Sequence, residues 1–254
     1  MTATATAVPS HRDPQLLGQT VVVIGGSSGI GLATATRARA EGADVILTGL
    51  HPDGALQRAA LDLGALSAAA FDANDPAELE RFFAGLPKEI DHVMVTAGGP
   101  HYGRLLETTS DELRHGLSDH LLLAVEAARN AADRVRPGGT LLFMTPEGGQ
   151  PIVGSGSELT VAAAFPALIA NLALELAPVR INLIAAGFID TPLSASLLGS
   201  DLEKRRDQLR ATLPIRRVVE PADVAALALH IMSNTALTGA TYTIDGGQRL
   251  VSAQ

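Results

Sequence analysis

The feature of this chain that most limits its fold is a glycine-rich turn between an apolar strand and a helix. The segment reads Gly25-Gly26-Ser27-Ser28-Gly29-Ile30-Gly31 and follows a β-branched run at 20–24 that suits a strand covered on both faces. Glycines permit a tight turn and let the backbone approach a phosphate where a Cβ would clash. The next helix, expected over 32–41, begins with unpaired N–H groups and a partial positive charge. The turn is therefore predicted to bind the pyrophosphate of a dinucleotide.

Strand-like and helix-like segments alternate along the rest of the chain. This alternation predicts a single α/β domain over 15–254, a Rossmann-type doubly wound parallel sheet of about seven strands flanked by helices. Residues 1–14 are expected to be a flexible tail, and binding sites are expected beyond the carboxyl ends of the strands. The further strands are expected at 44–48, 68–71, 92–96, 140–144, 180–184 and 241–244, and the further helices at 55–63, 76–84, 110–135 and 158–176.

Composition excludes several classes of function. The formal net charge of −8 disfavours binding to nucleic-acid phosphates or to anionic lipid surfaces. The chain has no cysteine, which excludes disulfides and thiolate chemistry, and its seven histidines show no metal-site spacing, so no metal is expected. We find no apolar run long enough for a membrane span and no secretory signal, and therefore expect a cytoplasmic protein.

The spacing of the turn is Gly-x-x-x-Gly-x-Gly, and with it the chain resembles the short-chain dehydrogenase/reductase family over about 16–250. Further landmarks of the resemblance are Asp72 after the third strand, Ala97-Gly98-Gly99 after the fourth, and the segment from Ala186 to Pro192 after the sixth. Two more stand near the C-terminus, Leu237-Thr238-Gly239 and Asp245-Gly246-Gly247.

The resemblance implies which residues hold a nicotinamide dinucleotide. Asp72 would bond the adenine amino group beside Ala73, although a helix cap explains Asp72 as well and Asp75 is the better cap candidate. Ala97 and Gly98 would line the adenosine ribose, while Ile189 and Thr191 would hold the nicotinamide carboxamide. The cofactor-binding residues are thus expected to be Gly25, Ser27, Ser28, Gly29, Ile30, Gly31, Leu50, His51, Asp72, Ala73, Ala97, Gly98, Ile189 and Thr191.

The segment after the second strand bears on the choice between NAD and NADP. An acid there would bind the ribose diol of NAD and repel the phosphate of NADP. Gly49 stands where relatives that prefer NAD carry Asp, and Leu50 stands where relatives that prefer NADP often carry Arg. Ser27, Ser28 and His51 can still bond a phosphate, so NADP is favoured over NAD. An exposed loop position explains His51 equally.

The resemblance fails at the catalytic positions. Family members reduce carbonyls with a Tyr, a Lys four residues later, a Ser and an Asn. Aligned through the segment at 172–178, these positions hold Glu158, Ala162, Pro146 and His120. The only tyrosines are Tyr102 and Tyr242, and neither lies in the helix at 158–176, so the usual tyrosinate mechanism is absent.

A rebuilt active site is one explanation. His120 and Glu158 stand at positions that face one cleft in this family, and a histidine near neutral pKa is a natural proton donor that a carboxylate can orient. Thr145 and Tyr102 would contact the substrate. Loss of catalysis is the other explanation, in which His120 lies at a subunit interface and Glu158 is a helix-start acid favoured by the dipole.

We therefore predict an NAD(P)H-dependent oxidoreductase that acts on a ketone or an alcohol through an atypical site. The alternatives are a non-catalytic nucleotide-binding or regulatory protein and a lyase or isomerase that uses Glu158 as a base. Pro146, Phe188 and Leu193 would make the substrate pocket apolar, which favours a hydrophobic substrate. The family resemblance also implies a homodimer or homotetramer.

Overall fold

The computed structural model describes residues 14–52, 54–148 and 152–251. All but Pro14 of the expected N-terminal tail lies outside these residues. The strands are Thr20–Ile24 (β1), Asp44–Gly49 (β2), Ser67–Ala70 (β3), Ile90–Val95 (β4), Val135–Pro146 (β5), Arg180–Ala186 (β6) and Thr241–Ile244 (β7). The helices are Gly29–Ala40 (α1), Gly54–Leu63 (α2), Pro76–Ala84 (α3), Ser110–Ala131 (α4), Gly156–Glu175 (α5), Pro192–Leu198 (α6), Leu202–Thr212 (α7) and Pro221–Ser233 (α8), with short 3-10 helices at Gly199–Asp201 (η1) and Gln248–Leu250 (η2).

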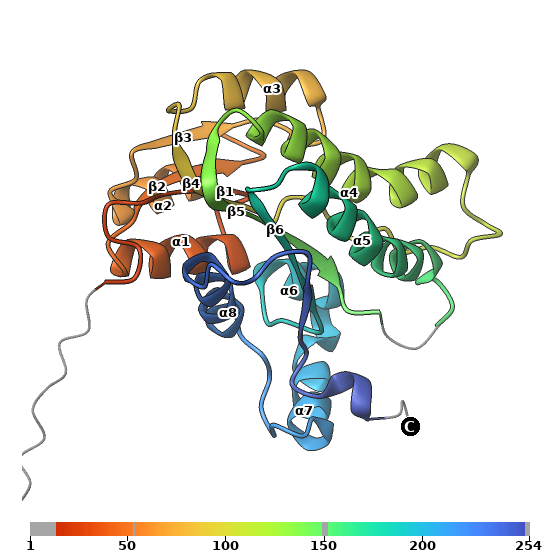
Figure 1. The fold of residues 1–254 in the computed structure, drawn as a ribbon. Coiled ribbons are helices and arrows are strands. Elements are labelled where there is room, and N and C mark those ends of the chain that lie inside the picture. The colour runs from red at the N-terminus through yellow and green to blue at the C-terminus, as the bar shows by residue number, and fades with distance from the viewer. Residues whose placement is uncertain (1–13, 53, 149–151, 252–254) are drawn as a thin grey trace, which may run out of the picture.

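The seven strands form one parallel sheet in the order β3-β2-β1-β4-β5-β6-β7. Helices α3, α4 and α5 cover one face, and α1, α2 and α8 cover the other (Figure 1). The predicted doubly wound α/β fold is therefore confirmed. The strand order reverses between β1 and β4, where such sheets leave a crevice at the carboxyl ends of the strands.

Strand β1 shows why the first apolar run has no polar alternation. Val22 and Ile24 pack into the core beneath α3, α4 and α5, whereas Val21 and Val23 pack beneath α1, α2 and α8. Successive side chains of a strand point to opposite faces, so a strand with helices on both sides must be apolar throughout.

Several boundaries differ from the sequence-based expectation, and one helix was missed. Helix α1 begins at Gly29, because the glycine turn itself supplies its first turn. The helix expected at 110–135 ends at Ala131, and β5 begins at Val135, since Pro137 and two following glycines cannot continue a helix. Helix α8, which begins with Pro221 at its first position, was not expected at all.

Helix α5 corrects the expectation that no segment is long and apolar enough to cross a membrane. Its 20 residues have a mean hydropathy of 1.5 over the most apolar window, which suffices by length and composition. In the fold it packs on α4, β5 and β6, with Val161, Phe165 and Ile169 buried in the core. Its apolar character is therefore that of a core helix.

Candidate functional site

The turn between β1 and α1 leaves no room for side chains at two of its glycines. Gly25 has a φ of +95°, and a Cβ there would lie 2.6 Å from Thr96 Oγ1. A Cβ on Gly31 would lie 2.2 Å from the carbonyl oxygen of Gly25. Thr96 Oγ1 donates to the carbonyl oxygens of Ile24 and Gly25, at 3.2 and 3.1 Å. The end of β4 thus fixes the turn against the start of α1.

The first turn of α1 is open to an anion. Its N-cap residue, Ser28, makes no side-chain capping bond, and the first turn contains no acidic residue. Unpaired N–H groups and the helix dipole favour negative charge at such a terminus. Thr191 lies over this start, since a Cβ on Gly29 would be 3.6 Å from its side chain. The residues present therefore fit the phosphate group of a dinucleotide.

The ends of β2 and β3 form the next part of this edge. Gly49 is buried, and a Cβ there would lie 3.3 Å from Ser27 Oγ, whereas Leu50 and His51 are exposed. Asp75 caps α3 by accepting from two backbone N–H groups, as expected, while Asp72 accepts from the N–H of Asn74.

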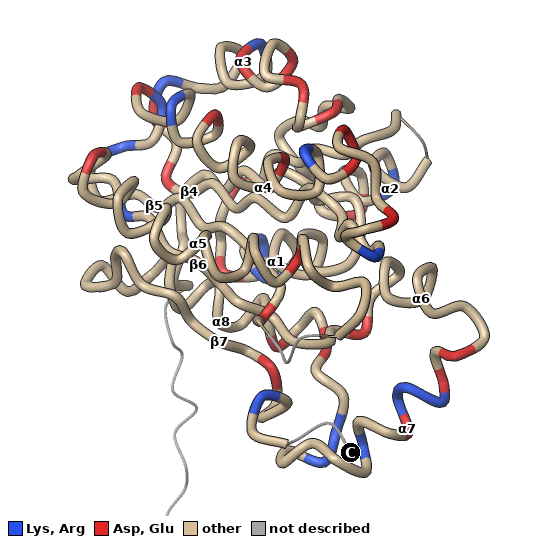
Figure 2. Tube along the Cα trace, turned by 90° about the vertical axis from the view of Figure 1, so that its right-hand side faces the viewer, with Lys and Arg blue, Asp and Glu red and all other residues tan. Residues whose placement is uncertain are grey.

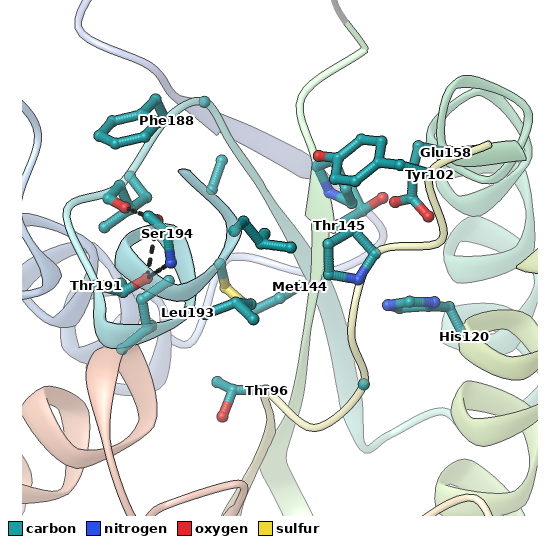
Figure 3. Close-up of a pocket in the computed structure, with 18 of the residues that line it drawn as sticks. Thr96, Tyr102, His120, Met144, Thr145, Glu158, Phe188, Thr191, Leu193 and Ser194 are labelled. Carbon is teal, nitrogen blue, oxygen red and sulfur yellow. Dashed lines mark hydrogen bonds between the residues drawn. The ribbon is translucent and has the colours of Figure 1, made fainter. Parts of the chain in front are cut away.

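A pocket of about 480 Å³ lies at the carboxyl ends of β1, β4, β5 and β6 (Figure 3). Twelve of the predicted residues line it, namely Ile30, Ala97, Gly98, Tyr102, His120, Thr145, Pro146, Glu158, Phe188, Ile189, Thr191 and Leu193. The other predicted residues do not line this pocket; they lie in the β1–α1 turn and after β2 and β3, and are Gly25, Ser27, Ser28, Gly29, Gly31, Leu50, His51, Asp72 and Ala73.

Glu158, in the first turn of α5, is the buried acid of the pocket. Its side chain is held by the loop before α4, because Oε1 accepts from the backbone N–H of His101 at 2.6 Å. The hydroxyl of Ser157 donates to the carbonyl oxygen of His101, also at 2.6 Å. Glu158 is only 4 % exposed, and Oε2 has no hydrogen-bond partner among the described residues. An unpaired buried carboxylate oxygen is costly, so a ligand that donates to it would be stabilised.

His120 reaches the same side of the pocket from α4, with Thr191 on the other side (Figure 3). Burial lowers the pKa of His120 below its usual value, and the negative charge of Glu158 opposes this shift. A Cβ on Gly98 would lie 3.0 Å from His120 Nε2, so glycine there makes room for the imidazole. The predicted pair therefore lines one pocket, and the Glu158 charge favours the protonated form of His120.

The other predicted positions near Glu158 include two with polar side chains and two whose side chains cannot donate a hydrogen bond. Thr145 has a buried hydroxyl that finds no partner among the described residues. Tyr102 is 62 % exposed, and partial burial, followed by the charge of Glu158, raises its pKa. Pro146 and Ala162, which the resemblance predicts at the family's Ser and Lys positions, offer no side-chain donor.

Sequence reasoning missed three residues at this edge. The backbone of His101 positions Glu158, and Thr96 fixes the glycine turn. Arg205 of α7 lines the pocket, although its charged segment resembles a solvated helix. His101 and Thr96 are each adjacent in the sequence to a predicted site residue, and this adjacency could have indicated them.

Comparisons with known proteins cover nearly the whole chain. A family model described as enoyl-(acyl carrier protein) reductase matches residues 24–249. The chain is 31 % identical over 249 residues to an NADP-dependent (R)-specific alcohol dehydrogenase of Lentilactobacillus kefiri, covering 92 % of this chain and 97 % of that protein. It is 28 % identical over 235 residues to a cyclic-di-GMP-binding biofilm dispersal mediator protein of Escherichia coli strain K12, covering 90 % and 96 %. The crystal structure of BdcA in complex with NADPH superposes with a TM-score of 0.77 at 28 % identity, covering 91 % and 95 %.

Replacing Glu158 with glutamine is expected to lower the pKa of His120 further, because the Glu158 charge favours the protonated imidazole. NMR titration of the His120 ring, assigned with a His120→Asn variant, measures this pKa. Glu107→Gln, which removes an exposed acid from the loop before α4, is the matched control and should leave the pKa unchanged. A pKa of His120 that stays constant or rises in Glu158→Gln contradicts the coupling.

Proposed function

The chain belongs to the short-chain dehydrogenase/reductase family, and from this premise we propose that it is an NADP(H)-dependent oxidoreductase that interconverts a ketone and an alcohol through an atypical site. The observation that carries this proposal is the pair of unpartnered polar atoms in the pocket, Glu158 Oε2 and Thr145 Oγ1. Both residues line the pocket, a substrate oxygen that reached either atom would satisfy it, and the pocket adjoins an intact glycine turn.

The dinucleotide would be held by the residues at the carboxyl ends of β1 to β4 and by Ile189 and Thr191 after β6. When bound, it supplies or accepts a hydride at its nicotinamide ring. NADP is favoured because residues 48–52 contain no carboxylate that would repel the additional phosphate. Ser27, Ser28 and His51 offer donors, and the guanidinium of Arg58 lies beside the start of α2 at Gly54. The names of the alcohol dehydrogenase relative and of the BdcA complex support the same cofactor.

Glu158 takes the place of the family's tyrosine in this proposal. In the oxidation direction Oε2 accepts the proton of the substrate hydroxyl, and in reduction the carboxyl group returns it to the carbonyl oxygen. The hydroxyl of Thr145 donates to that same oxygen and orients it. Burial lowers the pKa of His120, and we assign this residue as the group that exchanges the proton with Glu158.

The proposed enzyme takes a largely apolar substrate and works as a homo-oligomer. Leu193, Leu197 and Leu198 line the pocket together with Phe188. The exposed part of α5 carries small side chains that would let a second copy approach closely, which are Ala163, Ala164, Ala167 and Ala170.

A non-catalytic nucleotide-binding protein is the second candidate. Loss of the four usual catalytic residues favours it, as does the relative described as cyclic-di-GMP-binding. This candidate requires cofactor binding without consumption of reduced cofactor.

The variants His120→Ala and Glu158→Gln are each expected to reduce kcat at least about tenfold, because each removes a group that moves the proton. Affinity for NADPH should stay within about twofold, since neither residue belongs to the glycine turn. Steady-state kinetics and fluorescence titration of NADPH measure the two quantities. His115→Ala and Glu107→Gln, exposed changes of the same kind, serve as controls. Unchanged kcat in both site variants would refute the pair.

Gly49→Asp is expected to weaken NADPH binding at least about tenfold, about 1.4 kcal/mol, while NADH binding is much less affected. The added carboxylate repels the 2′-phosphate. Gly49→Asn is the matched control, because its Cβ meets Ser27 at the same 3.3 Å without adding charge. Titrations with both cofactors separate charge from steric effects. Equal losses of NADPH affinity in the two variants would argue against NADP at this position.

A further inference from the structure

Arg205 is the one positively charged side chain among the described residues that line the pocket. It extends from α7 and is partly buried, and its guanidinium carbon lies 5.8 Å from the centre of the Phe188 ring. Figure 3 places Phe188 on the opposite side of the pocket from Glu158. The pocket thus has a carboxyl group on one side and a guanidinium on the other.

The other arginines of α7 are paired with acids, and Arg205 is not. Figure 2 shows both signs of charge along this helix. Arg206 forms two hydrogen bonds with Asp190, at 2.8 and 2.7 Å, and Arg210 pairs with Asp207 at 2.7 Å. Arg205 donates to the uncharged Gln208 at 2.8 Å, and no carboxylate of the described residues lies within ion-pair distance of it.

A partly desolvated cation without a counter-ion has a free-energy cost that a bound anion would remove. Burial already lowers the pKa of Arg205, but a guanidinium remains charged at neutral pH. Its planar donors match a carboxylate, which they bind through two parallel hydrogen bonds. Leu197 and Leu198 also line the pocket and favour an apolar segment in the ligand.

We propose that Arg205 binds a carboxylate of the substrate, so that the substrate is an oxo acid or hydroxy acid with an apolar body. This inference rests on the proposed function, because it places the reacting oxygen of the same molecule at Glu158. The apolar body spans the pocket between the two charged side chains.

The test compares straight-chain methyl-ketone carboxylates of increasing length with their methyl esters as substrates for NADPH oxidation. The best acid should exceed its ester at least about tenfold in kcat/KM. Arg205→Met should remove this preference by raising KM for the acid, with the ester unchanged. Lys204→Met removes an exposed charge from the same helix and should leave the preference intact. An acid-to-ester ratio that Arg205→Met does not change, or that both variants lower equally, overturns the proposal.

A binding measurement separates this inference from the proposed function. Calorimetry of the full-length protein, with NADPH present, would compare an unreactive straight-chain fatty carboxylate with its methyl ester. If the carboxylate binds more tightly than its ester, and Arg205→Met abolishes this difference, the anion site is supported. This holds even if the protein reduces no ketone, a result that would refute only the proposed oxidoreductase activity. Equal binding of carboxylate and ester overturns the role of Arg205.

Discussion

The close approach of the β1–α1 turn to its own helix and to β4 is the constraint on which the site depends. Gly31 packs on the carbonyl oxygen of Gly25 with no room for a Cβ, and Thr96 donates its hydroxyl to that same oxygen. This contact joins the central strand pair to the start of α1. The contact therefore determines where an anion would bind at the N-terminus of α1 and how far the pocket lies from this terminus.

The reactive part of the site is built on a second, separate contact. The loop after β4 is held to the start of α5 by the backbone of His101, which bonds both Glu158 and Ser157. This contact buries one oxygen of Glu158 without a partner while keeping the side chain in the pocket wall. The pocket therefore presents a carboxyl group at the position where the sequence resemblance predicts the family's phenol.

The fold could be predicted because it depends on local patterns, whereas the cofactor-binding residues stay a prediction that rests on the glycine turn. Apolar runs fix the strands wherever tertiary packing does not oppose them. The placement of Glu158 could not be predicted, since its contact with His101 joins residues that are far apart in the sequence. The role of Arg205 could not be predicted from the sequence. Only the structure shows that Arg206 and Arg210 of the same helix are paired with acids, whereas Arg205 is not.

The most direct test of the central claim is whether this chain both binds and consumes NADPH. The protein is first titrated with NADPH and NADH, and the NADPH complex is then mixed with a panel of ketones while the absorbance of the reduced nicotinamide is followed. The account predicts tighter binding of NADPH than of NADH and loss of absorbance matched by formation of an alcohol. Binding of NADPH with no loss of absorbance across the panel would contradict it.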